Sequence, residues 1–325
     1  MKMTLPSFRS PTSRLAVLAW AGCLAMPCHA QSAALIDQAR MRSALLDVQP
    51  GMLDEDKDGD GVPDNVEGEA VATPGDLDLG VQLIMKEQER AHLLRLFATS
   101  QVYFTDNVRL TNFNPESDAY LFTEVGARYE GKLTEQWNVE ATVRQAFFRY
   151  DDFSNLDFES LNAGAGISYR LPQDPSLMFF SRYNCERLTA DDLDDQFFLN
   201  QTVSLGLQKS WVTPASSLYY LGYASSFGFA DPSAAERDEH GLYGGARWQL
   251  TECLHADLYS RFAFFDYDSG QHDWNYMIVP SLTYRFNEWC ELNASLSFVL
   301  NRSNRDLFDY DALSAGGGLG LKVQF

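Results

Sequence analysis

The strongest candidate for site chemistry is an acidic, glycine-containing run, DKDGDGVPDNVE, over residues 56–67. Its spacing matches a calcium loop, with carboxylates at positions one, three, five, nine and twelve, a glycine at six and a backbone carbonyl at seven. The corresponding residues are Asp56, Asp58, Asp60, Asp64, Glu67, Gly61 and Val62. Calcium requires six or more oxygen ligands, and these carboxylates would repel one another without a cation. We therefore expect a structural Ca²⁺ site; the alternative is a solvated acidic linker.

A second set of candidate residues is basic and falls on the polar faces of strand-like segments. It comprises Arg128, Arg144, Arg170, Arg247, Arg261, Arg285 and Lys322. All except Arg144 and Arg261 lie just before a short turn or the chain end. In a closed barrel these would form a basic ring at one opening, which could attract anionic solutes or hold the acidic front segment.

Ion pairing across strands is the alternative role for these cations. Hairpin counting gives three pairs: Arg128–Glu140, Arg247–Asp257 and Arg285–Glu291. Arg170 and Lys322 have no expected acidic partner. Anion selection and structural ion pairing therefore both remain open from the sequence.

Strands must position these side chains, and the last segment of the chain is typical of them. Its apolar side chains, Leu319, Leu321, Val323 and Phe325, alternate with Gly320, Lys322 and Gln324. This period of two puts the two sets on opposite faces of a strand. An apolar outer face and a polar inner face are what a membrane barrel needs. From residue 97 onward the same pattern recurs between turn signals and predicts an all-β, twelve-stranded antiparallel barrel over 97–325.

The expected connections alternate in character. Those near residues 133, 173, 213, 251 and 287 are short, whereas those near 105–118, 151–158, 187–195, 230–239 and 267–273 are longer and acidic. Outer-membrane barrels have short periplasmic turns and longer external loops, so both termini are expected in the periplasm. Aromatic residues near the strand ends are expected to form interface girdles. These are Tyr103, Phe147, Phe148, Tyr150, Phe264, Phe265, Tyr284 and Phe286.

The front of the chain does not resemble the barrel. Residues 1–30 have a basic start, a short apolar run and a small-residue exit at Cys28-His29-Ala30, which predicts a cleaved signal peptide. Residues 31–96 are expected to form a small periplasmic segment of helices and loops that carries the calcium-like run. A bridge between Cys253 and Cys290 is conceivable, because both lie near predicted turns on one side.

Charge and motifs exclude several classes of function. The formal net charge is −20 and becomes −23 without the signal peptide, which argues against a nucleic-acid partner. No run of apolar residues after the leader is long enough for a transmembrane helix. The chain has neither a Gly-x-Ser-x-Gly motif nor a phosphate-binding loop, so we do not expect an enzyme.

Four sequence motifs resemble those of known families. VYFTDNVRLT (102–111) and the final NRSNRDLFDYDALSAGGGLGLKVQF resemble the first and last strands of bacterial outer-membrane β-barrel porins. These are related to the barrels of exopolysaccharide-export proteins and surface lipoprotein assembly modifiers. Gly320-x-x-Val323-x-Phe325 resembles the assembly signal read by the barrel assembly machinery, and DGDGVPD resembles a thrombospondin type 3 loop.

The porin resemblance implies a barrel embedded in outer-membrane lipid that passes small or anionic solutes. Two alternatives remain. One is an accessory barrel for export of an exopolysaccharide or another surface polymer, against which the lack of tandem helical repeats counts. The other is a closed structural barrel.

Overall fold

The computed structural model describes residues 93–190, 195–213 and 217–325. This part of the chain holds twelve strands: β1 (Leu94–Thr105), β2 (Asp118–Lys132), β3 (Trp137–Tyr150), β4 (Phe158–Leu171), β5 (Asp174–Thr189), β6 (Gln196–Val212), β7 (Ser217–Asp231), β8 (Arg237–Thr251), β9 (Leu254–Tyr267), β10 (His272–Asn287), β11 (Cys290–Ser303) and β12 (Tyr310–Gln324). The predicted number of strands is confirmed, although β1 begins at Leu94 rather than at Phe97. No helix in these residues is long and apolar enough to cross a membrane.

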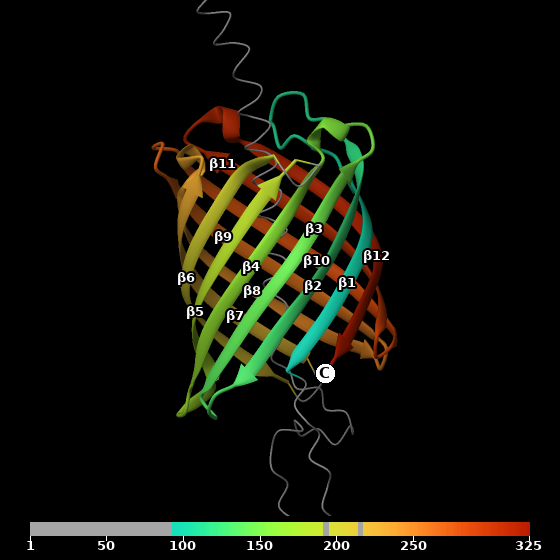
Figure 1. The fold of residues 1–325 in the computed structure, drawn as a ribbon, viewed down its shortest axis with the longest axis vertical. Coiled ribbons are helices and arrows are strands. Elements are labelled where there is room, and N and C mark those ends of the chain that lie inside the picture. The colour runs from blue at the N-terminus through green and yellow to red at the C-terminus, as the bar shows by residue number, and fades with distance from the viewer. Residues whose placement is uncertain (1–92, 191–194, 214–216) are drawn as a thin grey trace, which may run out of the picture. The chain divides into compact units, whose positions relative to one another are not determined.

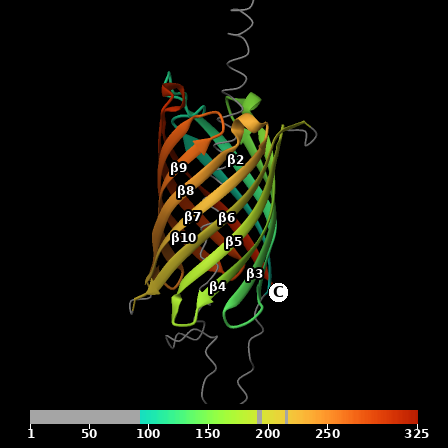
Figure 2. The same cartoon turned by 90° about the vertical axis from the view of Figure 1, so that its left-hand side faces the viewer.

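The sheet is closed and antiparallel. Each strand pairs with its neighbours in sequence, and β1 also pairs with β12, from Arg95↔Gln324 to Thr105↔Ser314. Figures 1 and 2 show the strands tilted around a common axis. Closure leaves no strand edge unpaired, which is a requirement for backbone that lies in lipid.

The two ends of the barrel differ in their connections. The short-turn end carries the links 133–136, 172–173, 213–216, 252–253 and 288–289, together with Leu93 and Phe325. The long-loop end carries 106–117, 151–157, 190–195, 232–236, 268–271 and 304–309. In Figure 1 the long-loop end is at the top and the C-terminus is at the bottom. Three 3-10 turns, η1 (Ser154–Leu156), η2 (Ser233–Ala235) and η3 (Asp306–Phe308), lie in the long loops.

Strand alternation gives the wall an apolar exterior. Leu205, Leu221 and Leu242 on β6, β7 and β8 are 50%, 57% and 55% exposed, although they belong to regular strands. Their neighbours along each strand are glycine, serine or tyrosine residues at positions that face the interior. A band of exposed leucine, valine and aromatic side chains continues around the wall. A surface of this kind is suited to lipid and not to water.

Candidate functional site

The interior of the short-turn half carries a ring of charged side chains, which we call the basic ring. Its cations are Arg95, Arg128, Arg170, Arg182, Arg247, Arg285 and Lys322, and its carboxylates are Glu130, Glu140, Asp257 and Glu291. All occupy inward positions of their strands. Seven cations and four carboxylates leave an excess of three positive charges. The described side chains of the basic ring therefore carry a net positive charge, although the whole chain has a net charge of −20.

The part of the basic ring on β2, β3 and β5 is organised around Glu140. Its carboxylate accepts a hydrogen bond from Arg128 Nη2 at 3.2 Å and one from Arg182 Nε. Arg128 also pairs with Glu130, at 2.6 Å from Nε to Oε1. The Arg182 guanidinium lies 4.8 Å above the centre of the Phe180 ring. These contacts hold the cations in fixed positions on the wall.

On the other side of the basic ring, two further ion pairs are formed. Arg247 Nε donates to Asp257 Oδ1 at 2.6 Å, and Lys322 Nζ lies 3.4 Å from Glu291 Oε2. The expectation that Lys322 has no acidic partner is therefore wrong. Glu291 lies between Arg285 on β10 and Gly320 on β12, and the lysine can reach it because Gly320 has no side chain.

Two cations of the basic ring have no carboxylate contact among the described residues. The Arg170 side chain, at the end of β4, has no hydrogen bond or ion pair there, as the sequence suggested. Among the described residues Arg95 on β1 contacts a neutral group: when the Gln324 amide is oriented with its oxygen toward the guanidinium, that oxygen accepts from Nε at 2.9 Å and from Nη2 at 3.0 Å. Arg95 also lies opposite Arg128 in the register of β1 and β2. Positive charge is thus incompletely compensated at this mouth.

Arg95 and Arg182 were not among the candidates from the sequence. Arg95 was missed because the first strand was expected to begin at Phe97. Arg182 was missed because only the start of the fifth strand was placed. The alternation of Met178, Phe180 and Arg182, all inward on β5, was the available signal.

The other two predicted lumenal arginines face inward but do not belong to the basic ring. Arg144 on β3 is 7% exposed. Arg261 on β9 donates from Nη1 to Glu239 Oε1 at 2.8 Å, and its side chain is largely buried. Both are therefore shielded from solvent, in contrast to the half-exposed members of the basic ring.

The long-loop half of the interior is packed. On β3 to β6, Phe148, Phe158, Leu188 and Phe198 point inward and are at most 2% exposed. The Phe148 and Phe158 rings stack with centroids 4.2 Å apart. On the β10 and β11 wall, polar groups are buried instead. Asn275 Nδ2 donates to Asn301 Oδ1 at 3.1 Å, and Asn301 Nδ2 donates to Asp273 Oδ2 at 3.1 Å.

The predicted aromatic girdles are partly wrong. Tyr103, Phe148, Tyr150 and Phe265 point inward and are buried. The reason is geometric: in the adjacent pairs Phe147-Phe148 and Phe264-Phe265, only one ring of each pair can face out. Phe147, Phe264, Tyr284 and Phe286 do occupy outward positions.

Aromatic side chains that face lipid cluster near both ends of the barrel. At the short-turn end Trp137 packs on Tyr169, with ring centroids 4.8 Å apart, and Trp248 Nε1 donates to the Tyr219 hydroxyl at 3.2 Å. Toward the long-loop end Trp274 packs between Phe262 and Phe264. Rings with polar edges are typical of the interfaces between lipid and water.

No catalytic triad is found on the described strands. The nearest arrangement is on the outer face, where His240 Nδ1 lies 3.0 Å from Ser225 Oγ and 3.1 Å from the Tyr223 hydroxyl. Among the described residues no carboxylate bonds to this histidine, and no group of three or more acidic, histidine or cysteine residues could hold a metal ion. Cys185, Cys253 and Cys290 are free thiols, so the conceivable bridge is not formed.

The calcium-like run, residues 56–67, lies outside the described residues, as do the predicted signal peptide and nearly all of the front segment. The Ca²⁺ site therefore stays a prediction. The predicted assembly signal does lie on β12, where Gly320 and Val323 face opposite sides and Phe325 is 63% exposed.

Comparison with known proteins identifies the fold. No family model matches the chain, and no curated protein matches its sequence. The structure is similar to the COG4313 outer membrane channel from Pseudomonas putida F1, with a TM-score of 0.52 and 12% identity, over 72% of this chain and 96% of that chain. At this identity the likeness concerns the fold alone.

Two other barrels resemble the chain less. One is the anion-selective porin from Comamonas acidovorans, with a TM-score of 0.39 and 8% identity over 71% of this chain and 98% of that chain. The other is the translocator domain of the autotransporter NalP from Neisseria meningitidis, with a TM-score of 0.40 and 11% identity over 72% and 89%. These scores are too low to support an inference from either barrel.

Proposed function

We propose that this chain forms a porin-like channel of the bacterial outer membrane that passes small solutes and prefers anions. The observation that carries the proposal is the basic ring: it is partly exposed to water, lies inside a wall whose exterior is apolar, and has an excess of positive charge. A ring of fixed cations lowers the energy of anions in a narrow aqueous passage and raises that of cations. The similarity to the outer membrane channel from Pseudomonas putida F1 supports the same class of function.

The orientation is part of the proposal. We place the short turns and both termini in the periplasm and the longer loops outside, because outer-membrane barrels have their short connections on the periplasmic side. The basic ring then lines the periplasmic half of the passage. Solutes entering from outside would first meet the packed long-loop half.

Reversal potentials in a planar lipid bilayer test this function. The purified full-length chain, with a KCl gradient across the membrane, is expected to give a potential that reports a higher permeability for chloride than for potassium. The preference should weaken as salt rises, because exposed charges are screened within about 8 Å at physiological ionic strength. A cation preference would overturn the anion assignment, and a folded protein that never conducts would overturn the channel.

A further inference from the structure

Loop 106–117, which joins β1 and β2, is packed onto the barrel. Asn107 is 2% exposed, Val108 is fully shielded and Leu110 is 8% exposed. These values match those of the interior and contrast with Phe113 in the same loop, which is 61% exposed. The first part of the loop therefore forms a small buried unit at the long-loop end.

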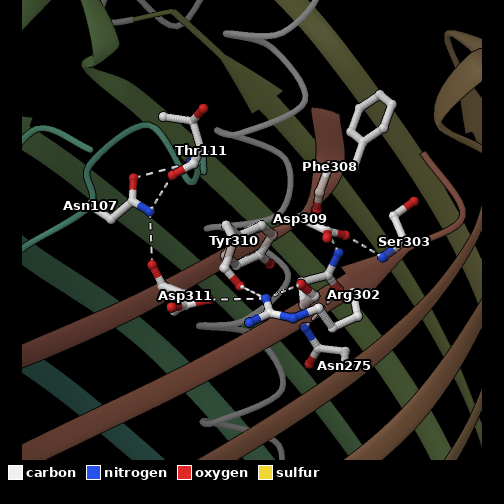
Figure 3. Close-up of polar contacts among 10 residues, drawn as sticks. Asn107, Thr111, Asn275, Arg302, Ser303, Phe308, Asp309, Tyr310 and Asp311 are labelled. Carbon is white, nitrogen blue, oxygen red and sulfur yellow. Dashed lines mark hydrogen bonds and ion pairs between the residues drawn. The ribbon is translucent and has the colours of Figure 1, made fainter. Parts of the chain in front are cut away.

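The Asn107 side chain ties this loop to β12, the strand that pairs with β1 to close the barrel. Asn107 Nδ2 donates to the backbone oxygens of Thr111 and Asp311, both at 2.8 Å, and Asn107 Oδ1 accepts from Thr111 N at 3.1 Å (Figure 3). Asp311 is on β12, so Asn107 joins the loop to the last strand beyond the final β1–β12 pair, Thr105↔Ser314. We call the three bonds of Asn107 the latch.

Neighbouring contacts fix both sides of the latch. Asp106 in the loop donates from N to the oxygen of Leu313 on β12 at 3.1 Å, and Leu313 N donates to Asp106 Oδ1 at 2.8 Å. Arg302 on β11 donates to Asp311 Oδ1 at 3.0 Å, as Figure 3 shows. Asp311, whose backbone oxygen accepts the latch bond on β12, is thereby also held by β11.

The loop is also tied to the β3–β4 connection. Arg109 pairs with Glu116 at 2.9 Å, and its guanidinium lies 4.9 Å from the centre of the Phe153 ring. Asp118, at the start of β2, accepts from the backbone N–H groups of Asp152 and Phe153, each at 3.1 Å. The loop is thus connected on both sides, to β12 and to residues 151–157.

The latched loop has a strained backbone. Leu110 has φ of 49° and Asn114 has φ of 51°. The left-handed region is unfavourable for a leucine, which has no polar side chain to stabilise it, and such conformations persist only where the surroundings enforce them. Without the latch, relief of the backbone strain at Leu110 favours a different conformation of the loop.

Inward residues beneath the loop are less exposed to water than the charged side chains of the basic ring. Beneath the latch, Tyr103, Thr105, Tyr310 and Ala312 point inward and are 4–6% exposed. In the basic ring, the side chains of Arg128, Glu140 and Arg247 are 17%, 21% and 37% exposed. The charged side chains of the basic ring are thus more accessible to water than the inward residues beneath the latch.

We propose that loop 106–117 is a latched cap of the external mouth and that the Asn107 latch sets how often it opens. This inference rests on the proposed channel function and its orientation. Opening breaks the bond from Asn107 to Asp311 on β12, lets Leu110 leave the left-handed region and exposes Val108. The periplasmic basic ring selects the solute, whereas the cap limits passage.

Thiol labelling tests the cap independently of conduction. In a background with all five cysteines (Cys23, Cys28, Cys185, Cys253 and Cys290) replaced by serine, Val108→Cys is the one reactive thiol and is exposed only when the cap opens. A water-soluble maleimide added to detergent-solubilised barrels should label it slowly. Adding Asn107→Asp, which keeps the acceptor but loses both donated bonds, should speed labelling by about tenfold, because each hydrogen bond contributes roughly 0.5–1.5 kcal/mol.

A matched control is available in the same loop. Thr111→Val changes a side chain whose hydroxyl bonds, within the described part of the chain, to the Phe113 backbone alone, whereas the latch uses the Thr111 backbone. It should leave the labelling rate within about twofold of the parent. Heat-modifiable migration on SDS gels verifies that each variant is a folded barrel. Equal labelling of the Asn107→Asp and parent barrels would overturn the cap.

Conductance then separates the cap from the channel. In bilayers, Asn107→Asp should spend more time in the open state than the unmodified chain, with the same ion preference. Faster labelling with no conductance in either protein would retain the movable loop but reject the channel and, with it, the cap's role. Conductance and open time unchanged by Asn107→Asp would reject the cap and retain the channel.

Discussion

Individual side chains in the lumen act through their partners as much as through their charge. Arg128, Arg182 and Arg247 are each held by a carboxylate, so each contributes mainly to the geometry of the wall. An exposed or half-exposed pair of this kind typically contributes at most about 1 kcal/mol to stability. The excess charge resides in residues such as Arg170, whose side chain has no carboxylate contact among the described residues.

The substitution Arg170→Gln should lower the preference for anions without affecting the fold. One unit charge acts on an ion about 4 Å away with about 1 kcal/mol in water, a factor of about five, and its sign is opposite for chloride and potassium. The chloride-to-potassium permeability ratio should therefore fall by up to about thirtyfold. The measurement is the reversal potential in a KCl gradient. Lys209→Gln is the control, because Lys209 lies at the same end of the barrel but outside it, paired with Asp174 at 2.8 Å. Equal effects of both variants would show that the lumen position of Arg170 is irrelevant.

At the level of the strand, small and aromatic residues are matched across the wall. The Phe180 ring on β5 lies over Gly206 on the neighbouring strand β6. The Tyr103 ring on β1 likewise lies over Gly316 on the neighbouring strand β12. A β-carbon at Gly206 would lie 2.3 Å from the Phe180 ring and 2.6 Å from the Tyr223 carbonyl oxygen. Aromatic rings placed over glycines in this way are a known stabilising device in sheets.

Gly206→Ala should therefore destabilise the barrel by about 1–3 kcal/mol, the usual effect of overpacking. The expected result is a lower temperature for the loss of heat-modifiable migration. Gly241→Ala is a matched control on β8, since the nearest atom to its new β-carbon is 3.6 Å away, an ordinary contact. A Gly206→Ala barrel as heat-resistant as Gly241→Ala would contradict the packing argument.

For the whole molecule, closure of the sheet is the decisive event, and the chain ends take part in it. Phe325 N donates to Leu94 O at 2.9 Å, and Leu94 N donates to Phe325 O at 3.3 Å. These bonds extend the β1–β12 pairing to the last residue. The apolar exterior can enter lipid only when this pairing satisfies both terminal strands.

Deleting Phe325 should reduce the yield of assembled barrel in cells, because both bonds and the aromatic end are lost. Two hydrogen bonds contribute roughly 1–3 kcal/mol together. Phe325→Leu separates the two causes, since it keeps the backbone pair and removes only the ring. Heat-modifiable barrel in outer-membrane fractions is the readout. A normal yield after the deletion would refute a role for the last residue.

The sequence by itself determined the wall of this protein. The period-two alternation, the turn signals and the contrast of connections predicted twelve strands, their inward and outward faces and the pairs Arg128–Glu140 and Arg247–Asp257. These features are local: side-chain direction follows from position along a strand, and hairpin partners follow from counting back from a turn. The predicted calcium run and front segment lie outside the residues that the structure describes.

Only the tertiary structure decided the contacts across closure and between loops. The latch from Asn107 to Asp311 depends on where β1 and β12 meet, and the pairing of Lys322 with Glu291 depends on the missing side chain at Gly320. The packing of the long-loop half likewise depends on which aromatic side chains lie at the same height along the barrel axis. Such contacts join residues up to two hundred positions apart, and no periodicity within a strand encodes their distance.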